Sequence, residues 1–105
     1  MRRPERLTRP EVEAWLREHP EWSIDNSHLV RELRTVNYAS GVAIVSAQVD
    51  IAEPLDHHPV VTLGYCEVRV VLWTHDRGGI TSLDLAYAHA FNELVDQRFL
   101  EVLTD

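Results

Sequence analysis

Three of the six histidines in this sequence fall where regular structure is expected to end. His57 and His58 follow a predicted helix, and His75 ends a predicted strand. Imidazole titrates closer to neutral pH than other side chains, so histidine is well suited to proton transfer. Glu53 and Asp56 lie a few residues away and can orient an imidazole or tune its charge. The cluster therefore indicates general acid–base chemistry at the ends of rigid elements.

Two other interpretations of these residues are open. Adjacent histidines before a proline are also typical of a solvated surface loop. The same imidazoles, with Glu53 or Asp56, offer nitrogen and oxygen ligands for a metal ion. The chain has no helical His-x-x-x-His pair and only one cysteine, Cys66, so the sequence predicts no metal site.

The elements that must position these residues begin with a helix and a β-hairpin. Residues 8–11 (Thr-Arg-Pro-Glu) have the form of a capping box, and the predicted helix ends at Pro20. Its apolar face comprises Val12, Trp15 and Leu16. Strands are predicted over 21–24 and 28–35, because residues 25–27 (Asp-Asn-Ser) have turn chemistry.

A second helix is predicted from Asn37, which can cap it, to about Ala52. Its expected buried face has apolar residues at helical spacing, namely Val42, Val45, Val49 and Ala52. Residues 53–59 are expected to form a polar corner. Glu53 and His58 each precede a proline, which disfavours the helical conformation, so both are expected at breaks in regular structure.

The second half of the chain contains the clearest strand, over 65–74, with alternating faces. A shorter strand is predicted over 60–63, and residues 75–79 form a turn. Residues 81–84 (Thr-Ser-Leu-Asp) open a last helix with capping-box logic. Its expected buried stripe comprises Leu83, Tyr87, Ala90, Phe91, Leu94 and Val95.

This order of elements predicts the α+β class, with an antiparallel sheet and helices on one side. The 105 residues favour one domain over positions 1–105. The net charge of −7 disfavours direct binding to nucleic acid. With the single Cys66 no internal disulfide can form, and no apolar stretch approaches the ~18 residues of a membrane span. We therefore expect a cytoplasmic protein without a membrane partner.

A longer spaced pattern surrounds the histidines. It comprises Glu53-x-x-x-His57-His58-Pro59, Tyr65, Thr74-His75, Gly79-Ile80-Thr81 and Asp84. This order and spacing resembles the signature of the pterin-4a-carbinolamine dehydratases, also known as the dimerisation cofactor family. Trp15-Leu16, Pro20-x-Trp22-Ser23 and Leu29-x-Arg31 are similar to the amino-terminal half of the family. The resemblance runs from about Leu7 to Leu94.

The resemblance implies a four-stranded antiparallel sheet with three helices packed on one face. It implies dehydration of 4a-hydroxytetrahydropterin to quinonoid dihydropterin, without metal or organic cofactor. This reaction recycles the pterin used in aromatic amino-acid hydroxylation. The substrate partner would be a small pterin, and the protein would form homodimers or homotetramers.

The resemblance also implies residue roles. His57 and His75 would be the catalytic acid–base pair, and His58 would mainly hold the pterin. Glu53 would orient an imidazole as part of the catalytic group. Substrate binding would involve His58, Pro59, Thr74 and Asp84, with Asp84 supporting the site through the His75 turn or acting as a helix cap.

The chain departs from the family pattern at two places. Val60-Val61 stand where the family usually has Glu-Trp, and Cys66 replaces an asparagine that commonly follows the tyrosine. Trp73 can lie near the site, but it is expected to cover the sheet. The alternative function is that of a non-catalytic relative, a transcriptional dimerisation partner or a Rubisco assembly factor. The retained histidines favour catalysis, because a pure binding protein does not need them.

Overall fold

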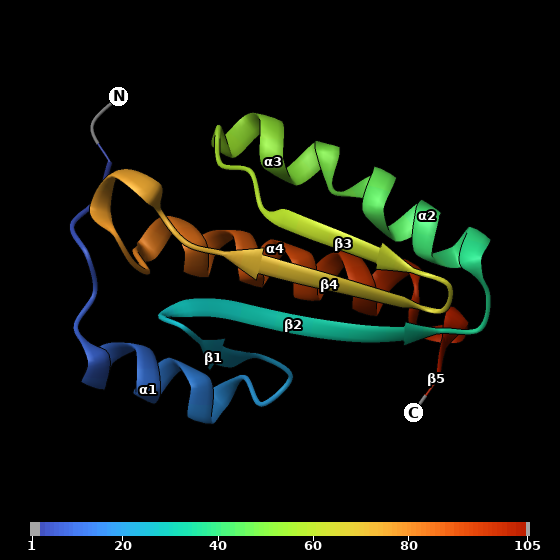
Figure 1. Ribbon diagram of the computed structural model, residues 1–105, viewed down its shortest axis with the longest axis horizontal. Coiled ribbons are helices and arrows are strands. Elements are labelled where there is room, and N and C mark those ends of the chain that lie inside the picture. The colour runs from blue at the N-terminus through green and yellow to red at the C-terminus, as the bar shows by residue number, and fades with distance from the viewer. Residues whose placement is uncertain (1–2, 105) are drawn as a thin grey trace.

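The computed structural model describes residues 3–104. Along the chain it contains α1 (Arg9–Glu18), β1 (Ser23–Asp25), β2 (His28–Thr35), α2 (Tyr38–Ala47), α3 (Val49–Leu55), β3 (Val60–Gly64), β4 (Glu67–Leu72), α4 (Ser82–Arg98) and β5 (Leu103–Thr104). Two 3-10 turns, η1 (His75–Arg77) and η2 (Leu100–Val102), precede α4 and β5. Figure 1 shows β2, β4 and β3 side by side, with α4 behind them.

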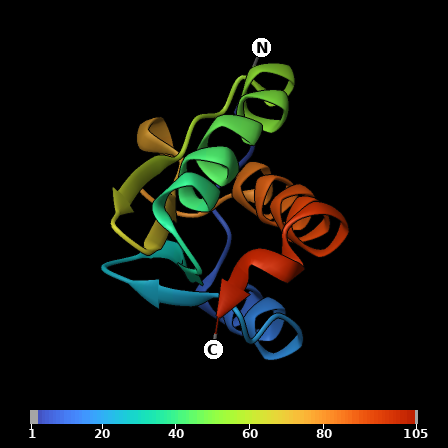
Figure 2. The same cartoon turned by 90° about the vertical axis from the view of Figure 1, so that its right-hand side faces the viewer.

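The strands form one antiparallel sheet in the order β1-β2-β4-β3. The central ladder pairs β2 with β4, from Leu29 opposite Leu72 to Arg34 opposite Glu67. Figure 2 shows the helices gathered on one side of this sheet, as the sequence predicted. The four expected strands are confirmed, and β5 is an additional short strand that pairs with the end of β2.

The core lies between the helix-facing side of the sheet and α4. The predicted alternation of β4 is confirmed, because Val68, Val70 and Leu72 are fully buried. Tyr87 and Phe91 on α4 are also fully buried and face them across the core. Full burial of one such side chain contributes about 1.5–3 kcal/mol. This contact holds α4 against the sheet and so fixes the position of Asp84 in its first turn.

Both predicted capping boxes are present. Thr8 accepts a hydrogen bond from the Glu11 amide, and the Glu11 carboxylate accepts one from the Thr8 amide. Thr81 and Asp84 form the second box at the start of α4. Since each box satisfies amides that the first turn leaves free, both helices begin where the sequence indicated.

The helix predicted over 37–52 is wrong in its extent. It is divided at Gln48 into α2 and α3, and α3 continues through Pro54 to Leu55. Glu53 is therefore helical, since a following proline only disfavours the helical conformation. A tertiary contact is present at the division: the Gln48 side chain is buried and accepts a hydrogen bond from the Tyr87 hydroxyl at 2.8 Å.

The buried face predicted for this segment is also wrong in part. Val42 and Val49 are 40% and 57% exposed, whereas Ile44 is fully buried and Ala52 is 6% exposed. Gly41 sets the contact face, because a Cβ there would lie 2.8 Å from the Leu63 side chain of β3. The helix approaches the sheet along its glycine, which turns the valines outward.

The turn between β1 and β2 has the predicted position. Asn26 and Ser27 have φ values of 53° and 64°, as in a tight hairpin turn with two left-handed residues. β1 begins at Ser23, two residues later than predicted, and β4 is shorter than the predicted strand over 65–74. The last residue of that segment, Thr74, instead forms an isolated bridge with Gly79.

Candidate functional site

A cleft of about 300 Å³ lies where β3 begins and β4 has ended, and His57, His58 and His75 all line it. Val60 lies opposite Val71, so antiparallel pairing places the segment before β3 beside the segment after β4. His57 and His58 belong to the first of these segments, and His75, the first residue of η1, belongs to the second. The structure thus brings together three histidines that are up to 18 positions apart.

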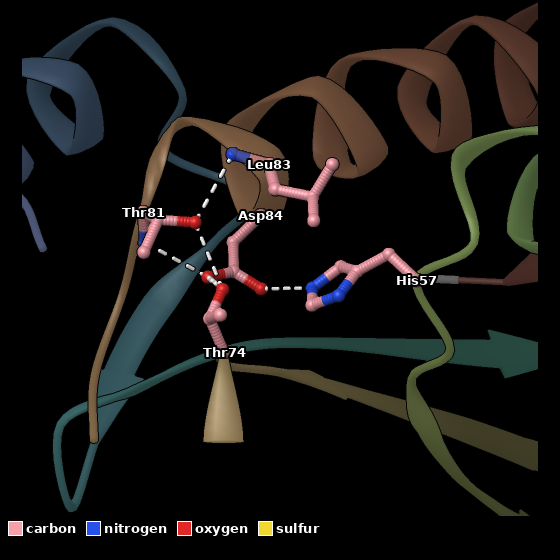
Figure 3. Close-up of polar contacts among 5 residues, drawn as sticks. All are labelled: His57, Thr74, Thr81, Leu83 and Asp84. Carbon is pink, nitrogen blue, oxygen red and sulfur yellow. Dashed lines mark hydrogen bonds and ion pairs between the residues drawn. The ribbon is translucent and has the colours of Figure 1, made fainter. Parts of the chain in front are cut away.

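His57 is the buried member of the three. Its Nε2 lies 2.5 Å from Oδ1 of Asp84, and the two side chains are 7% and 0% exposed. Figure 3 shows the His57 ring turned toward Asp84 at the start of α4. An ionised carboxylate only accepts hydrogen bonds, so Nε2 carries the proton and Nδ1 is left as the basic nitrogen. The contact orients the ring and favours one tautomer.

The Asp84 carboxylate is satisfied on both oxygens. Its Oδ2 accepts from the Thr74 hydroxyl and from the Thr81 amide, both at 2.9 Å, while Oδ1 accepts from His57. Figure 3 shows all three donors converging on this carboxylate. The buried charge is thereby paired with donors, as a buried carboxylate requires. Asp84 is at once the helix cap and the partner of His57.

His58 has a carboxylate partner of its own. Its Nε2 lies 2.6 Å from Oε2 of Glu53, with side chains 56% and 66% exposed. An exposed pair of this kind adds little to stability, about 0–1 kcal/mol. Its effect is on ring orientation, and it leaves Nδ1 of His58 as the nitrogen without the carboxylate contact. Glu53 therefore orients an imidazole, which is the contact that the sequence suggested.

The residues expected to bind substrate differ in burial and in the cavity that they line. Asp84 is fully buried and Thr74 is 1% exposed, and the Thr74 hydroxyl lies within hydrogen-bonding distance of Asp84 and Thr81. Both side chains make hydrogen bonds within the protein, and their expected part in substrate binding stays a prediction. Pro59 lies on the other side of His58 and lines an adjoining groove of about 270 Å³.

The sequence did not indicate one feature of the site and gave less weight to another. The direct contact between His57 and Asp84 joins residues 27 positions apart, and the sequence linked Asp84 to the His75 turn instead. Trp73 lines the histidine cleft, although a place near the site was the less favoured of its two expected positions. The available signal was its position directly before Thr74-His75, because consecutive residues after the end of a strand lie close together in space.

The hydroxyl of Tyr87 on α4 anchors the beginning of α3, the helix that precedes the loop with His57. Burial raises the pKa of this hydroxyl above its ordinary value, so it stays protonated and donates to Gln48 at the start of α3. The His57 amide donates to the Ala52 carbonyl, which ties the loop to the end of α3. The position of His57 therefore depends on the packing of α3 against α4.

Within residues 3–104, no group of three or more histidine, cysteine, aspartate or glutamate side chains is arranged to hold a metal ion. No helix in the same range is long and apolar enough to cross a membrane. The site is defined by imidazoles and carboxylates at a sheet edge, in an α+β protein with an antiparallel sheet.

The comparisons with known proteins agree with this class. The family model for pterin 4 alpha carbinolamine dehydratase matches residues 5–94. A Chloroflexus aurantiacus protein is 38% identical over 90 residues, which cover 86% of this chain and 97% of that protein. Its provisional name is pterin-4-alpha-carbinolamine dehydratase. A provisionally named relative of Natronomonas pharaonis is 41% identical over 92 residues, covering 88% and 98%. The chain belongs to the pterin-4a-carbinolamine dehydratase family.

Two solved structures are similar to this fold. A transcriptional coactivator/pterin dehydratase from Brucella melitensis superposes with a TM-score of 0.80 at 30% identity, covering 86% of this chain and 98% of that one. A pterin dehydratase-like protein identified as a RuBisCO assembly factor in the alpha-carboxysome gives 0.56 at 19% identity, covering 70% and 84%. The second likeness shows a shared fold only.

Proposed function

We propose that this protein dehydrates a 4a-hydroxytetrahydropterin to the quinonoid dihydropterin by histidine acid–base catalysis. The observation that carries the proposal is the convergence of His57, His58 and His75 on one cleft, with a carboxylate on the ring of each of the first two. Those carboxylates leave Nδ1 as the basic nitrogen in His57 and His58.

The reaction requires two proton transfers. The C–O bond at C4a breaks as a proton reaches the hydroxyl oxygen, and water leaves. A second proton leaves the neighbouring ring nitrogen, whose electrons form the new double bond to C4a. The imidazole in its neutral form accepts the proton from the ring nitrogen, the protonated imidazole gives its proton to the leaving hydroxyl, and each transfer contributes about 10²–10⁴-fold. The two imidazoles thereby exchange protonation states, so the acid must regain a proton and the base must release one before the next turnover.

We assign the base to His57 and the acid to His75. An imidazolium formed at His57 would face the buried Asp84 carboxylate, which stabilises the positive charge as it develops. His75 is exposed at the rim of the cleft, where it can be reprotonated from solvent between turnovers. His58, held by Glu53, is assigned to substrate binding.

The decisive experiment follows water loss from freshly generated carbinolamine, with the spontaneous rate subtracted. We expect acceleration that saturates with substrate and is lost in a His57→Ala, His75→Ala double variant. A wild-type rate equal to the background would refute catalysis. In that case, the alternative of a non-catalytic binding or assembly protein would take its place; the name of the Brucella structure includes a transcriptional coactivator.

We also propose that the protein is a homo-oligomer. Tyr38, Val42 and Val49 on the outer side of α2 and α3 are 50%, 40% and 57% exposed. Among the described strands β3 pairs only with β4, so its outer edge has free backbone groups. Sedimentation equilibrium tests the proposal, and a Val42→Asp, Val49→Asp variant should be shifted toward the monomer if this face is the contact.

A further inference from the structure

Trp73 contacts two imidazole rings at the rim of the cleft. Its indole stacks on the His28 ring with 3.9 Å between centroids and 10° between planes. It also contacts the His75 ring at 4.3 Å and 38°. Leu29 lies opposite Leu72, so His28 and Trp73 occupy the next positions along the same pair of strands. Rings at these separations attract each other.

The three histidines of the cleft differ in what holds their rings. His57 is held by Asp84 and His58 by Glu53, each through a ring nitrogen. The ring of His75 makes no hydrogen bond to any residue in the described range 3–104, and the residue is exposed. The indole of Trp73 is the group that limits where the His75 ring can lie.

Trp73 is itself firmly placed. It follows the last paired residue of β4, and the next residue, Thr74, is fixed by its amide, which donates to the Gly79 carbonyl at 2.9 Å. The buried Thr74 hydroxyl donates to Asp84. With the backbone held on both sides and His28 on one face, the indole is a rigid surface for His75.

We infer that Trp73 is the positioning residue for His75 and that His28 holds Trp73 in turn. The indole contacts both imidazoles, so Trp73 can act on His75 through ring packing. Without the indole, the His75 ring is free to occupy its other staggered rotamers. Proton transfer needs this ring within hydrogen-bond reach of the substrate.

The first test reads the stack without reference to activity. In a ¹H–¹³C spectrum, the ring protons of His75 should be shifted upfield by the indole ring current. We expect this shift to disappear in Trp73→Ala, to persist in reduced form in Trp73→Phe, and to shrink in His28→Ala. Absence of the shift in the wild type would overturn the inference, whatever the activity.

The second test is kinetic and rests on the proposed function. Trp73→Ala should lower kcat by about 2- to 10-fold, the factor that corresponds to one lost aromatic contact, with little change in KM. Trp73→Phe should recover most of the loss, and His28→Ala should lower kcat by a smaller factor. His19→Ala is the matched control, because it removes the Trp15–His19 stack of 4.0 Å and 13° on α1, and kcat should not change.

The outcomes separate the two proposals. If the ring-current shift is lost in Trp73→Ala while kcat stays at the wild-type value, the positioning role is wrong and the dehydratase function stands. If the wild type shows the shift but no rate above background, the proposed function fails and the catalytic role of the stack fails with it. If Trp73→Ala does not fold, Trp73→Phe and His28→Ala decide the question on both readouts.

Discussion

Replacing Asp84 by asparagine tests how the buried carboxylate controls His57. Three donors converge on this side chain: the His57 ring, the Thr74 hydroxyl and the Thr81 amide. An asparagine of the same shape has one acceptor oxygen and one NH₂ group. If the oxygen takes the Oδ2 position and keeps the helix cap, the NH₂ group faces Nε2 of His57.

That arrangement forces a change of tautomer. Nε2 must then accept the hydrogen bond, so the proton moves to Nδ1 and the ring presents a donor where it presented a base. The buried site also loses a charged acceptor with no exposure to water, which costs about 1–3 kcal/mol of the free energy of unfolding. The loss of His57 as a general base should lower the dehydration rate by about 10²-fold, as in His57→Ala.

The control for Asp84→Asn is Glu11→Gln. Glu11 occupies the same position in the capping box of α1, without a histidine contact. Urea denaturation and the dehydration assay should be run on both variants. For Glu11→Gln we expect a small change in the free energy of unfolding and no change in the dehydration rate. A folded Asp84→Asn protein with the wild-type rate would show that Asp84 has only a structural role as a cap.

Four further predictions follow from the site. His57→Ala and His75→Ala should each lower the dehydration rate by about 10²-fold in the background-corrected assay, and unchanged rates would remove both from the mechanism. His58→Ala should raise KM more than it lowers kcat, and the reverse pattern in steady-state kinetics would contradict its binding role. Burial raises the pKa of Tyr87 above 10.0, so the contribution of this group is present below about pH 10 and is lost as the pH rises above it. The free energy of unfolding measured by urea denaturation should therefore fall as the pH rises above about 10, and Tyr87→Phe should weaken that dependence although it also loses the hydrogen bond to Gln48. Purified protein should contain no stoichiometric zinc or iron by elemental analysis, and dehydration should survive chelator; a metal bound one to one and needed for the rate would replace acid–base catalysis by metal-assisted chemistry.

Local patterns in the sequence were sufficient for most of the elements. The alternation that predicted β4 and the two capping boxes depend on residues two to four positions apart, and these relations hold wherever the element is placed in the fold. The spaced histidine signature indicated the family in the same way, since it is a property of the order of residues along the chain.

The tertiary structure decided which faces of α2 and α3 are buried and which side chains they contact. The outward turn of Val42 and Val49 depends on Gly41 meeting β3, and Gln48, where the helix divides, is bound by Tyr87 from α4. These contacts join segments that helical periodicity treats separately, so a pattern of valines could not reveal them.

The same reason applies to the site. The sequence by itself determined that His57, His58 and His75 would fall at the ends of elements, because the breaks around them are local. The contact of His57 with Asp84, and the stack of His28, Trp73 and His75, were decided by strand register and by the docking of α4. Register and docking are set by the packing of the whole core, which no local spacing encodes.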